Sequence, residues 1–312
     1  MTDASGTTTY TYDSMDRLTE KATPEGNLTY TYDGDGHLAS MQSSNTNGVY
    51  VSYTYDTLNR LSTVVDHRLT GNQTTTYTYD NASNVATVAY PNGVTATFGY
   101  DQLNRVTSLS NSPQSGSYSY QEDNAGKKKQ VTDPSGRIAV WSYDGINRLN
   151  GEGISGAPIG RDGTVAYGLD PVGNRTSVSS GISGLSPVAG TFNPDDELSS
   201  ETYDPNGNVT ATGGKSYTYD AENHLVSMGS TVALVYDGDG NRIRKTVSGT
   251  VTSYLVDDLN PTGYPQVVDE LTNGTVSRTY TYGSSGSVRS RSSPAPGRPA
   301  STSTTAAGTS AN

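Results

Sequence analysis

The chain contains no cysteine and few large apolar side chains. Among its 312 residues there are only 2 Phe and 1 Trp. Without Cys, neither a disulfide scaffold nor thiolate chemistry is available. Leu, Ile, Val and Phe together make up roughly 16% of the chain, below the level of about 20% at which disorder becomes the default expectation. The net charge of -11 adds self-repulsion, so an ordered fold needs another source of burial.

Other absences limit the location and the partners. No run of about 18 apolar residues is present, so we expect no membrane span. The N-terminal residues lack a basic start followed by an apolar stretch, so no signal peptide is visible in this chain. The acidic balance disfavours nucleic acid as a partner.

Tyrosine supplies what the aliphatic residues do not. There are 23 Tyr and 35 Gly, and the Tyr recur at regular positions. A Tyr ring buries a large area while its hydroxyl reaches water or a partner, which suits thin, half-exposed sheets. Gly next to Asn or Asp favours turns. The composition therefore predicts an ordered, tyrosine-rich β protein.

The chain is built from an internal sequence repeat. Strong copies of Tyr-Asp-x-x-(Asn/Gly/Asp)-(Arg/His)-Leu lie 20 to 24 residues apart in the N-terminal part and 16 to 17 apart near the C-terminus, and weaker copies begin at Tyr120, Leu169 and Phe192. The repeat positions that we single out are Tyr12, Asp13, Arg17, Leu18, Tyr32, Asp33, Tyr55, Asp56, Arg60, Leu61, Tyr79, Asp80, Tyr100, Asp101, Arg105, Tyr143, Asp144, Arg148, Leu149, Tyr203, Asp204, Tyr219, Asp220, Tyr236 and Asp237.

One repeat is predicted to be one β-hairpin. Alternating Tyr, as in residues 9–12, places two rings on one face of a strand. The Asp after the second Tyr can accept backbone amides and start a turn. An Arg or His then precedes an apolar residue that opens the return strand, and we expect this basic side chain to bond to a neighbouring turn. About a dozen hairpins would pair into a curved or spiral sheet over residues 1–283, so the predicted fold class is all-β.

The repeat pattern resembles the YD or RHS repeat of bacterial Rhs and wall-associated toxins, of insecticidal toxin-complex B and C components, and of teneurins. The resemblance covers about residues 7–283. In that family the repeats coil into a shell around a C-terminal toxic segment. It implies that this chain is a wall segment of such a shell, partnered by the remaining shell segments or by an enclosed toxin, and located outside the cell or on its surface.

The end of the chain departs from the family pattern. Residues 254–283 resemble the approach to the family's conserved core, which carries an autoproteolytic site. Residues 284–312 are instead a Ser/Thr/Arg/Pro/Ala tract without alternation. We expect a fragment that lacks the core and the toxin, with a tail that is either disordered or the product of a shifted reading frame or gene fragmentation.

Candidate metal sites are interpreted as turns. Asp33 to His37 and Asp237 to Asn241 alternate oxygen ligands as a calcium loop does. Such a loop needs Gly at its sixth and Glu at its twelfth position, where the second stretch has Arg242 and Ser248. We therefore expect neither a metal nor another cofactor.

Catalytic residues are not indicated either. His37 and His224 occupy the Arg position of the repeat, and His67 lies in an irregular linker. The adjacent carboxylates at 195–197 and 257–258 point to opposite faces of a strand, so they are not natural dyads. The Asp-Pro-x-Gly segments at Asp133, Asp170 and Asp204 recur at turns. The run 127–129 of three Lys is interpreted as a solvated sheet edge.

The sequence favours a structural role without catalysis. The preferred hypothesis is a shell segment that encloses or presents a toxin. The alternative is a carbohydrate-binding or adhesion array, in which exposed Tyr rings stack on the sugars of cell-surface glycans.

Overall fold

The computed structural model describes residues 2–3, 6–68, 71–113, 116–158, 160–283 and 289–292. All the elements in these residues are strands, β1 to β29, so the prediction of an all-β chain of consecutive hairpins is confirmed. The described residues contain no helix of the length and apolarity needed to cross a membrane. The chain divides into two compact units, residues 1–75 with 213–312 and residues 76–212.

The first unit combines the two ends of the chain. Its N-terminal strands are β1 (Thr2–Asp3), β2 (Gly6–Thr7), β3 (Thr9–Tyr12), β4 (Leu18–Thr23), β5 (Gly26–Tyr32), β6 (Leu38–Ser43), β7 (Tyr50–Tyr55) and β8 (Leu61–Asp66). Its C-terminal strands are β22 (Lys215–Tyr219), β23 (Leu225–Met228), β24 (Val232–Tyr236), β25 (Arg242–Val247), β26 (Thr250–Asp257), β27 (Gln266–Thr272), β28 (Thr275–Thr281) and β29 (Arg289–Ser292). Apart from β29, the tail predicted at 284–312 lies outside the described residues.

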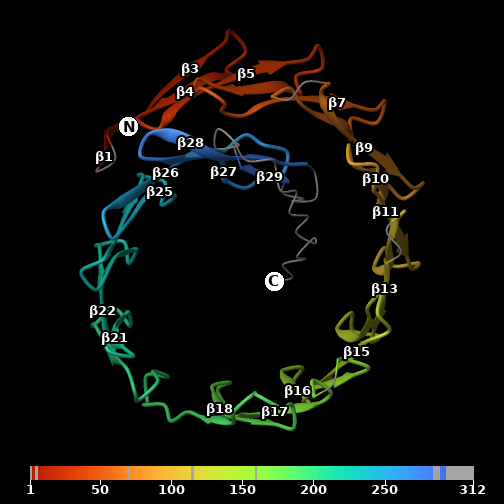
Figure 1. The fold of residues 1–312 in the computed structure, drawn as a ribbon, viewed down its shortest axis with the longest axis vertical. Coiled ribbons are helices and arrows are strands. Elements are labelled where there is room, and N and C mark those ends of the chain that lie inside the picture. The colour runs from red at the N-terminus through yellow and green to blue at the C-terminus, as the bar shows by residue number, and fades with distance from the viewer. Residues whose placement is uncertain are drawn as a thin grey trace. The chain divides into compact units, whose positions relative to one another are not determined.

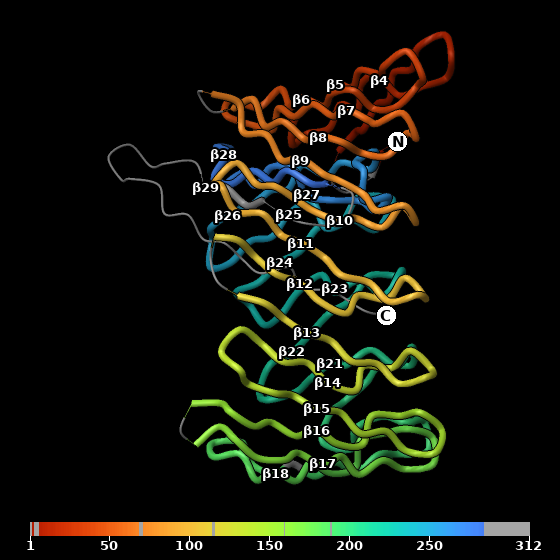
Figure 2. The backbone as a smooth tube through the Cα atoms, turned by 90° about the vertical axis from the view of Figure 1, so that its right-hand side faces the viewer, coloured from red at the N-terminus to blue at the C-terminus, as the bar shows by residue number. Residues whose placement is uncertain are grey.

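The second unit is one run of hairpins. After β9 (Gln73–Tyr79), which crosses the boundary, it contains β10 (Val85–Ala89), β11 (Thr95–Tyr100), β12 (Val106–Ser112), β13 (Gly116–Glu122), β14 (Lys128–Thr132), β15 (Ile138–Tyr143), β16 (Leu149–Ser155), β17 (Gly163–Leu169), β18 (Arg175–Ser180), β19 (Val188–Ala189), β20 (Thr202–Tyr203) and β21 (Val209–Thr212). Strands β10 to β18 pair antiparallel in chain order (Figure 2).

The Tyr-Asp turns share one backbone geometry. In the β11–β12 turn, Asp101 N donates to Arg105 O at 3.0 Å and Asn104 N donates to Asp101 O at 3.1 Å. Asn104 has φ 59°, a left-handed conformation that Asn, Asp and Gly tolerate best. The register shifts between Gly99 and Tyr100, which marks a bulge beside the turn. This geometry explains why the fourth turn position is so often Asn, Gly or Asp.

The two halves of the first unit pack face to face. Strands β26 to β28 lie alongside the first hairpins (Figure 1). The fully buried apolar side chains come from both sides: Leu28, Met41 and Val51 from the N-terminal hairpins, and Leu255 and Val268 from the C-terminal strands. Long-range packing therefore supplies here the apolar burial that a single hairpin layer lacks.

The second unit has a thinner core. Its buried residues are few and, apart from Tyr77, small or medium-sized, such as Ala96, Ala139 and Val165; most of its strand residues are half-buried or exposed. The lysine run lies inside this sheet. Lys128 and Lys129 belong to β14, which pairs with both β13 and β15, so the interpretation of this run as a sheet edge is wrong. Lys127 instead occupies the Arg position of a repeat turn.

Candidate functional site

Each Tyr-Asp turn is held by the carboxylate of its Asp. Asp144 Oδ1 accepts the amides of Ile146 at 3.0 Å and Arg148 at 2.8 Å, and Asp144 Oδ2 accepts Arg148 Nε at 2.7 Å. These donors favour the ionised form and lower the pKa of Asp144, with the Arg148 amide as the largest cause. The same pair of amide bonds is made by Asp13, Asp33, Asp56, Asp80, Asp101, Asp123, Asp133, Asp170, Asp204, Asp220 and Asp237.

The residue four positions after this Asp joins one turn to the next. Arg148 Nη1 donates to Asp170 O at 2.7 Å, and Arg105 Nη1 donates to Asp123 O at 3.1 Å. Side-chain bonds of this kind connect six turns on one edge of the sheet, at 80–84, 101–105, 123–127, 144–148, 170–174 and 193–197. We call this set of links the turn ladder: Asn84 to Asn104, Arg105 to Asp123, Lys127 to Asn147, Arg148 to Asp170 and Asn174 to Asp196.

The repeat Tyr joins the strands beside the turns. Tyr55 OH donates to Leu38 O at 3.1 Å, and its ring centroid lies 4.6 Å from that of His37. Tyr32 OH donates to Leu18 O at 2.8 Å, and its ring carries the Arg17 guanidinium at 4.5 Å. Tyr55 and Tyr32 thus each contact both the basic and the apolar residue of the preceding repeat. The same hydroxyl-to-carbonyl bond is made by Tyr100, Tyr143, Tyr236 and Tyr282.

The three His residues serve the same scaffold. His37 and His224 each place Nδ1 at 3.2 Å from the Asp of their own turn and pack against the Tyr ring of the next repeat. His67 Nε2 lies 2.7 Å from Ser52 Oγ, and its ring contacts Tyr50. Within the described residues, no group of three or more His, Cys, Asp or Glu side chains could hold a metal ion.

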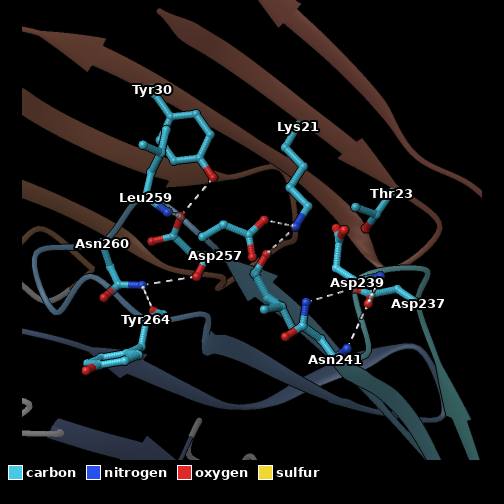
Figure 3. Close-up of polar contacts among 12 residues, drawn as sticks. Lys21, Thr23, Tyr30, Asp237, Asp239, Asn241, Asp257, Leu259, Asn260 and Tyr264 are labelled. Atoms are coloured by element: carbon cyan, nitrogen blue, oxygen red, sulfur yellow. Dashed lines mark hydrogen bonds and ion pairs between the residues drawn. The ribbon is translucent and has the colours of Figure 1, made fainter. Parts of the chain in front are cut away.

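A buried polar junction connects the two halves of the first unit. Tyr30 OH on β5 donates to Asp257 Oδ1 on β26 at 2.9 Å (Figure 3). Lys21 Nζ on β4 donates to Val256 O at 3.3 Å and to the Asp258 carboxylate. Lys21 is 3% exposed and Asp257 is 0% exposed. The adjacent Asp257 and Asp258 carboxylates therefore bond to different residues of the N-terminal strands, Tyr30 on β5 and Lys21 on β4.

The third carboxylate of this junction is Asp269 on β27. Its Oδ1 accepts the amide of Val49 at 2.9 Å, and its Oδ2 accepts Asn45 Nδ2 at 3.4 Å. Burial raises the pKa of Asp269. It satisfies a backbone donor of the 44–49 turn that would otherwise be buried unpaired.

Asp257 is the most strongly perturbed carboxyl in the junction. Its Oδ1 also accepts the amide of Leu259 at 3.0 Å, whereas its Oδ2 is buried with no hydrogen-bond partner among the described residues. Burial raises the pKa of Asp257 to about 6, and neighbouring Asp258 adds to the increase. No local signal in the sequence marks this burial or the roles of Lys21 and Asp269.

Two families match parts of the chain. Residues 65–151 match the family described as Teneurin YD-shell, and residues 1–28 and 32–70 match the RHS Repeat family. The chain belongs to the RHS/YD-repeat family. The matched regions of this YD-repeat chain contain the turns that begin at Asp13, Asp33, Asp56, Asp80, Asp101, Asp123, Asp133 and Asp144, whereas the later turns lie outside them.

Curated relatives of the YD-repeat chain are much longer proteins. The tRNA3(Ser)-specific nuclease WapA of Bacillus spizizenii is 38% identical over 144 residues, which are 41% of this chain and 6% of that protein. The tRNA nuclease WapA of Bacillus subtilis strain 168 is 38% identical over 140 residues, which are 40% of this chain and 6% of that protein. The YD-repeat chain thus matches only a small part of each relative.

Solved structures share its fold. The TcdB2-TccC3 crystal structure superposes with a TM-score of 0.69 at 14% identity. The match covers 89% of the protein described here and 18% of the TcdB2-TccC3 chain. The Tc holotoxin pore of Photorhabdus luminescens gives a TM-score of 0.64 at 14% identity. This match covers 92% of the protein described here and 19% of the holotoxin chain. These likenesses show the fold of a YD-repeat sheet.

Removing one repeat Tyr hydroxyl is expected to destabilise the first unit. Tyr55 is half-buried, its pKa is raised to about 12 by burial, and its hydroxyl donates to Leu38 O. We expect Tyr55→Phe to lower the free energy of unfolding by about 1 kcal/mol, measured by urea denaturation of the full chain. Tyr12→Phe is the matched control, because Tyr12 is 57% exposed. Equal effects of the two substitutions would contradict the role assigned to the Tyr55 hydroxyl.

The junction predicts a pH dependence of stability. Because burial raises the pKa of Asp257 from 3.8 to about 6, its contribution to stability is complete below pH 3.8 and is lost as pH rises through about 6. The difference amounts to about 3 kcal/mol. Asp257→Asn should flatten the dependence of the unfolding free energy between pH 4.5 and 7.5.

Urea denaturation at several pH values checks this prediction. Asp195→Asn, in an exposed turn of the second unit, controls for the loss of one negative charge. The lowered pKa values of the turn aspartates act in the opposite direction, since their stabilisation is lost only as pH falls below about 4. An unchanged slope in Asp257→Asn would rule out Asp257 as its source.

Proposed function

We propose that the chain is a segment of the wall of a shell that encloses or presents a toxic polypeptide, and that it performs no catalysis itself. The observation that carries this proposal is the turn ladder. The polar side chains that recur in the repeat are engaged in holding the next repeat, as the Arg148 guanidinium holds the Asp170 carbonyl. A surface whose charged groups hold its own repeats is suited to form a wall.

The similarity to WapA proteins supports a role for the chain as one part of a larger protein. WapA proteins are named as tRNA nucleases, and the part of them that this chain matches is a small fraction of their length. We infer that any comparable activity of the parent protein resides outside the YD repeats. The remaining shell segments and the enclosed polypeptide are the proposed partners, and the proposed location is extracellular or at the cell surface.

The alternative, a carbohydrate-binding array, has weaker support. Stacking on sugars needs exposed rings, whereas Tyr32, Tyr55 and Tyr143 use their hydroxyls and ring faces within the sheet. The described residues do include the 72% exposed Tyr264 and the 57% exposed Tyr12. Glycan binding is therefore kept as an outcome of the test.

Purification of the native gene product tests the proposal. An affinity tag inserted in the exposed loop 183–187 allows isolation from the source cells without denaturation. We expect a polypeptide segment outside the YD repeats, linked to or bound by the shell, to resist protease until urea unfolds the repeats. Mass spectrometry before and after urea identifies that segment.

Two results would overturn the proposal. One is a tagged protein that carries no polypeptide beyond the YD repeats. The other is sugar-specific binding on a glycan array that is lost in Tyr264→Ala and Tyr12→Ala, which would favour the alternative.

A variant in the turn ladder, Arg148→Gln, should make the enclosed segment digestible at a lower urea concentration, because one link between turns is lost.

A further inference from the structure

Lys21 is a lysine buried between the two halves of the first unit. It is 3% exposed, and it is the one lysine among the buried residues in the part of the chain that the structure describes. Its Nζ donates to Val256 O at 3.3 Å and contacts the Asp258 carboxylate. Val256, Tyr254 and Ile243 form a buried apolar cluster beside it. The Lys21 amine therefore meets the Asp258 carboxylate on a side that the protein closes to water.

An ion pair in such a place is costly. Removing an ammonium from water costs free energy that its attraction to a carboxylate repays only in part. Transfer of a proton from Lys21 Nζ to the Asp258 carboxylate leaves a neutral amine and a neutral carboxylic acid, and burial favours this neutral pair. The neutral amine has the lone pair that an ammonium lacks, so a buried lysine can act as a nucleophile.

A second carboxyl beside this pair can carry a proton. Asp257 is fully buried, and its Oδ2 has no hydrogen-bond partner among the described residues. Burial raises the pKa of Asp257, and the charges of Asp258 and Lys21 also influence it, which shows that both lie near. The Tyr30 hydroxyl holds its other oxygen in place (Figure 3). Asp257 is therefore suited to give a proton to a neighbouring group and to take one back.

We propose that Lys21 and Asp258 join in an isopeptide bond, a covalent cross-link between β4 and β26. The Nζ lone pair attacks Asp258 Cγ and forms the C–N bond. The C–O bond then breaks, and its oxygen leaves as water after taking a proton from Asp257. The nitrogen gives a proton to Asp257 in return, so Asp257 ends as it began. One amine and one carboxylic acid thus yield one amide and one water, with no oxidant or activating group.

The same molecule contains a lysine that should not react. Lys127 Nζ lies 3.3 Å from the Asp123 carboxylate, and the two side chains are 24% and 35% exposed. Water can hydrate both charges there, so both groups stay ionised and the ammonium has no lone pair to use. Lys127 is therefore an internal comparison for Lys21.

The cross-link would close most of the chain into a covalent ring. Lys21 and Asp258 are 237 residues apart, and the chain has no Cys with which a disulfide could join its ends. Groups held in contact react as if present at an effective concentration on the order of 10⁵ M or more, which favours amide formation over hydrolysis. The 34% exposure of Asp258 gives the released water a way out. The inference does not depend on the proposed function.

Mass spectrometry of the denatured full chain tests the cross-link. We expect an intact mass lower than that of the sequence by one water, and a tryptic product in which fragment 18–60 is joined to fragment 246–278. In a denaturing gel the chain should migrate faster than Lys21→Arg, whose guanidinium keeps the charge but stays protonated. A chain that is folded by near-ultraviolet circular dichroism and has the full sequence mass overturns the proposal.

Two variants separate the cross-link from other losses of water. Asp-Gly pairs such as Asp144-Gly145 can lose water by closing a ring with their own backbone, but that loss persists in Lys21→Arg and reverses in mild base. Asp258→Asn should lose ammonia in place of water, because the same attack then expels the side-chain amide. Water lost from Lys21→Arg that resists base, or lost within fragment 18–60 alone, overturns the assignment to Asp258.

The rate of cross-linking tests the proton transfer. Asp257→Asn keeps the size of the side chain but removes its acidic proton, so the cross-linked form should appear about a hundredfold more slowly during cell-free synthesis, as followed by gel migration. Asp195→Asn, in an exposed turn, controls for the loss of one negative charge and should react at the original rate. An equal rate in Asp257→Asn overturns the step assigned to Asp257.

Discussion

The carboxylate of the Asp that follows the first strand of each hairpin sets the turn geometry on which the structure depends. Its one oxygen accepts two backbone amides, as Asp101 accepts those of Leu103 and Arg105. That arrangement leaves the fourth residue in the left-handed region and creates a bulge at the preceding Tyr. The other oxygen orients the Arg side chain. The direction of the return strand and the reach of the Arg both follow from one short side chain that can accept several bonds at once.

Repetition lets such local order become a stable protein. A lone hairpin of this composition buries little apolar area and would be marginal. Here a repeat Tyr such as Tyr55 packs against the basic residue of the preceding turn and bonds to the carbonyl beyond it, so an added repeat stabilises its neighbour. Hydrogen bonds between neighbouring repeats form again at each added repeat. Their stabilisation compensates for the small apolar burial that the few aliphatic residues provide.

The first unit solves a different problem. Its N-terminal and C-terminal halves bury one another, and the layer between them encloses Lys21, Asp257 and Asp269 with few or no water contacts. Burying these groups costs free energy unless they are bonded. Asp269 and Lys21 are bonded to the opposite half, whereas one oxygen of Asp257 is not. The junction is therefore specific but dependent on protonation, in contrast to the pH-tolerant turns of the repeat.

The sequence by itself determined the hairpin, the position of its turn and the family, because these depend on contacts within one or two repeats. The Tyr-Asp spacing and the turn residues are local signals, and the role of Asn104 follows from its tolerance of positive φ. The run at 127–129 was misread as an edge, because strand order in a sheet is not a local property.

Only the tertiary structure decided which equivalent positions differ in environment. Tyr53 and Tyr217 hold the same place in the repeat, yet Tyr53 is buried and Tyr217 is half-exposed. The partners of Asp257 and Asp269 lie 227 and 220 residues away in the chain. No periodic pattern encodes such a separation. A repeat specifies each hairpin in the same way, and burial depends on which hairpins the folded chain brings together.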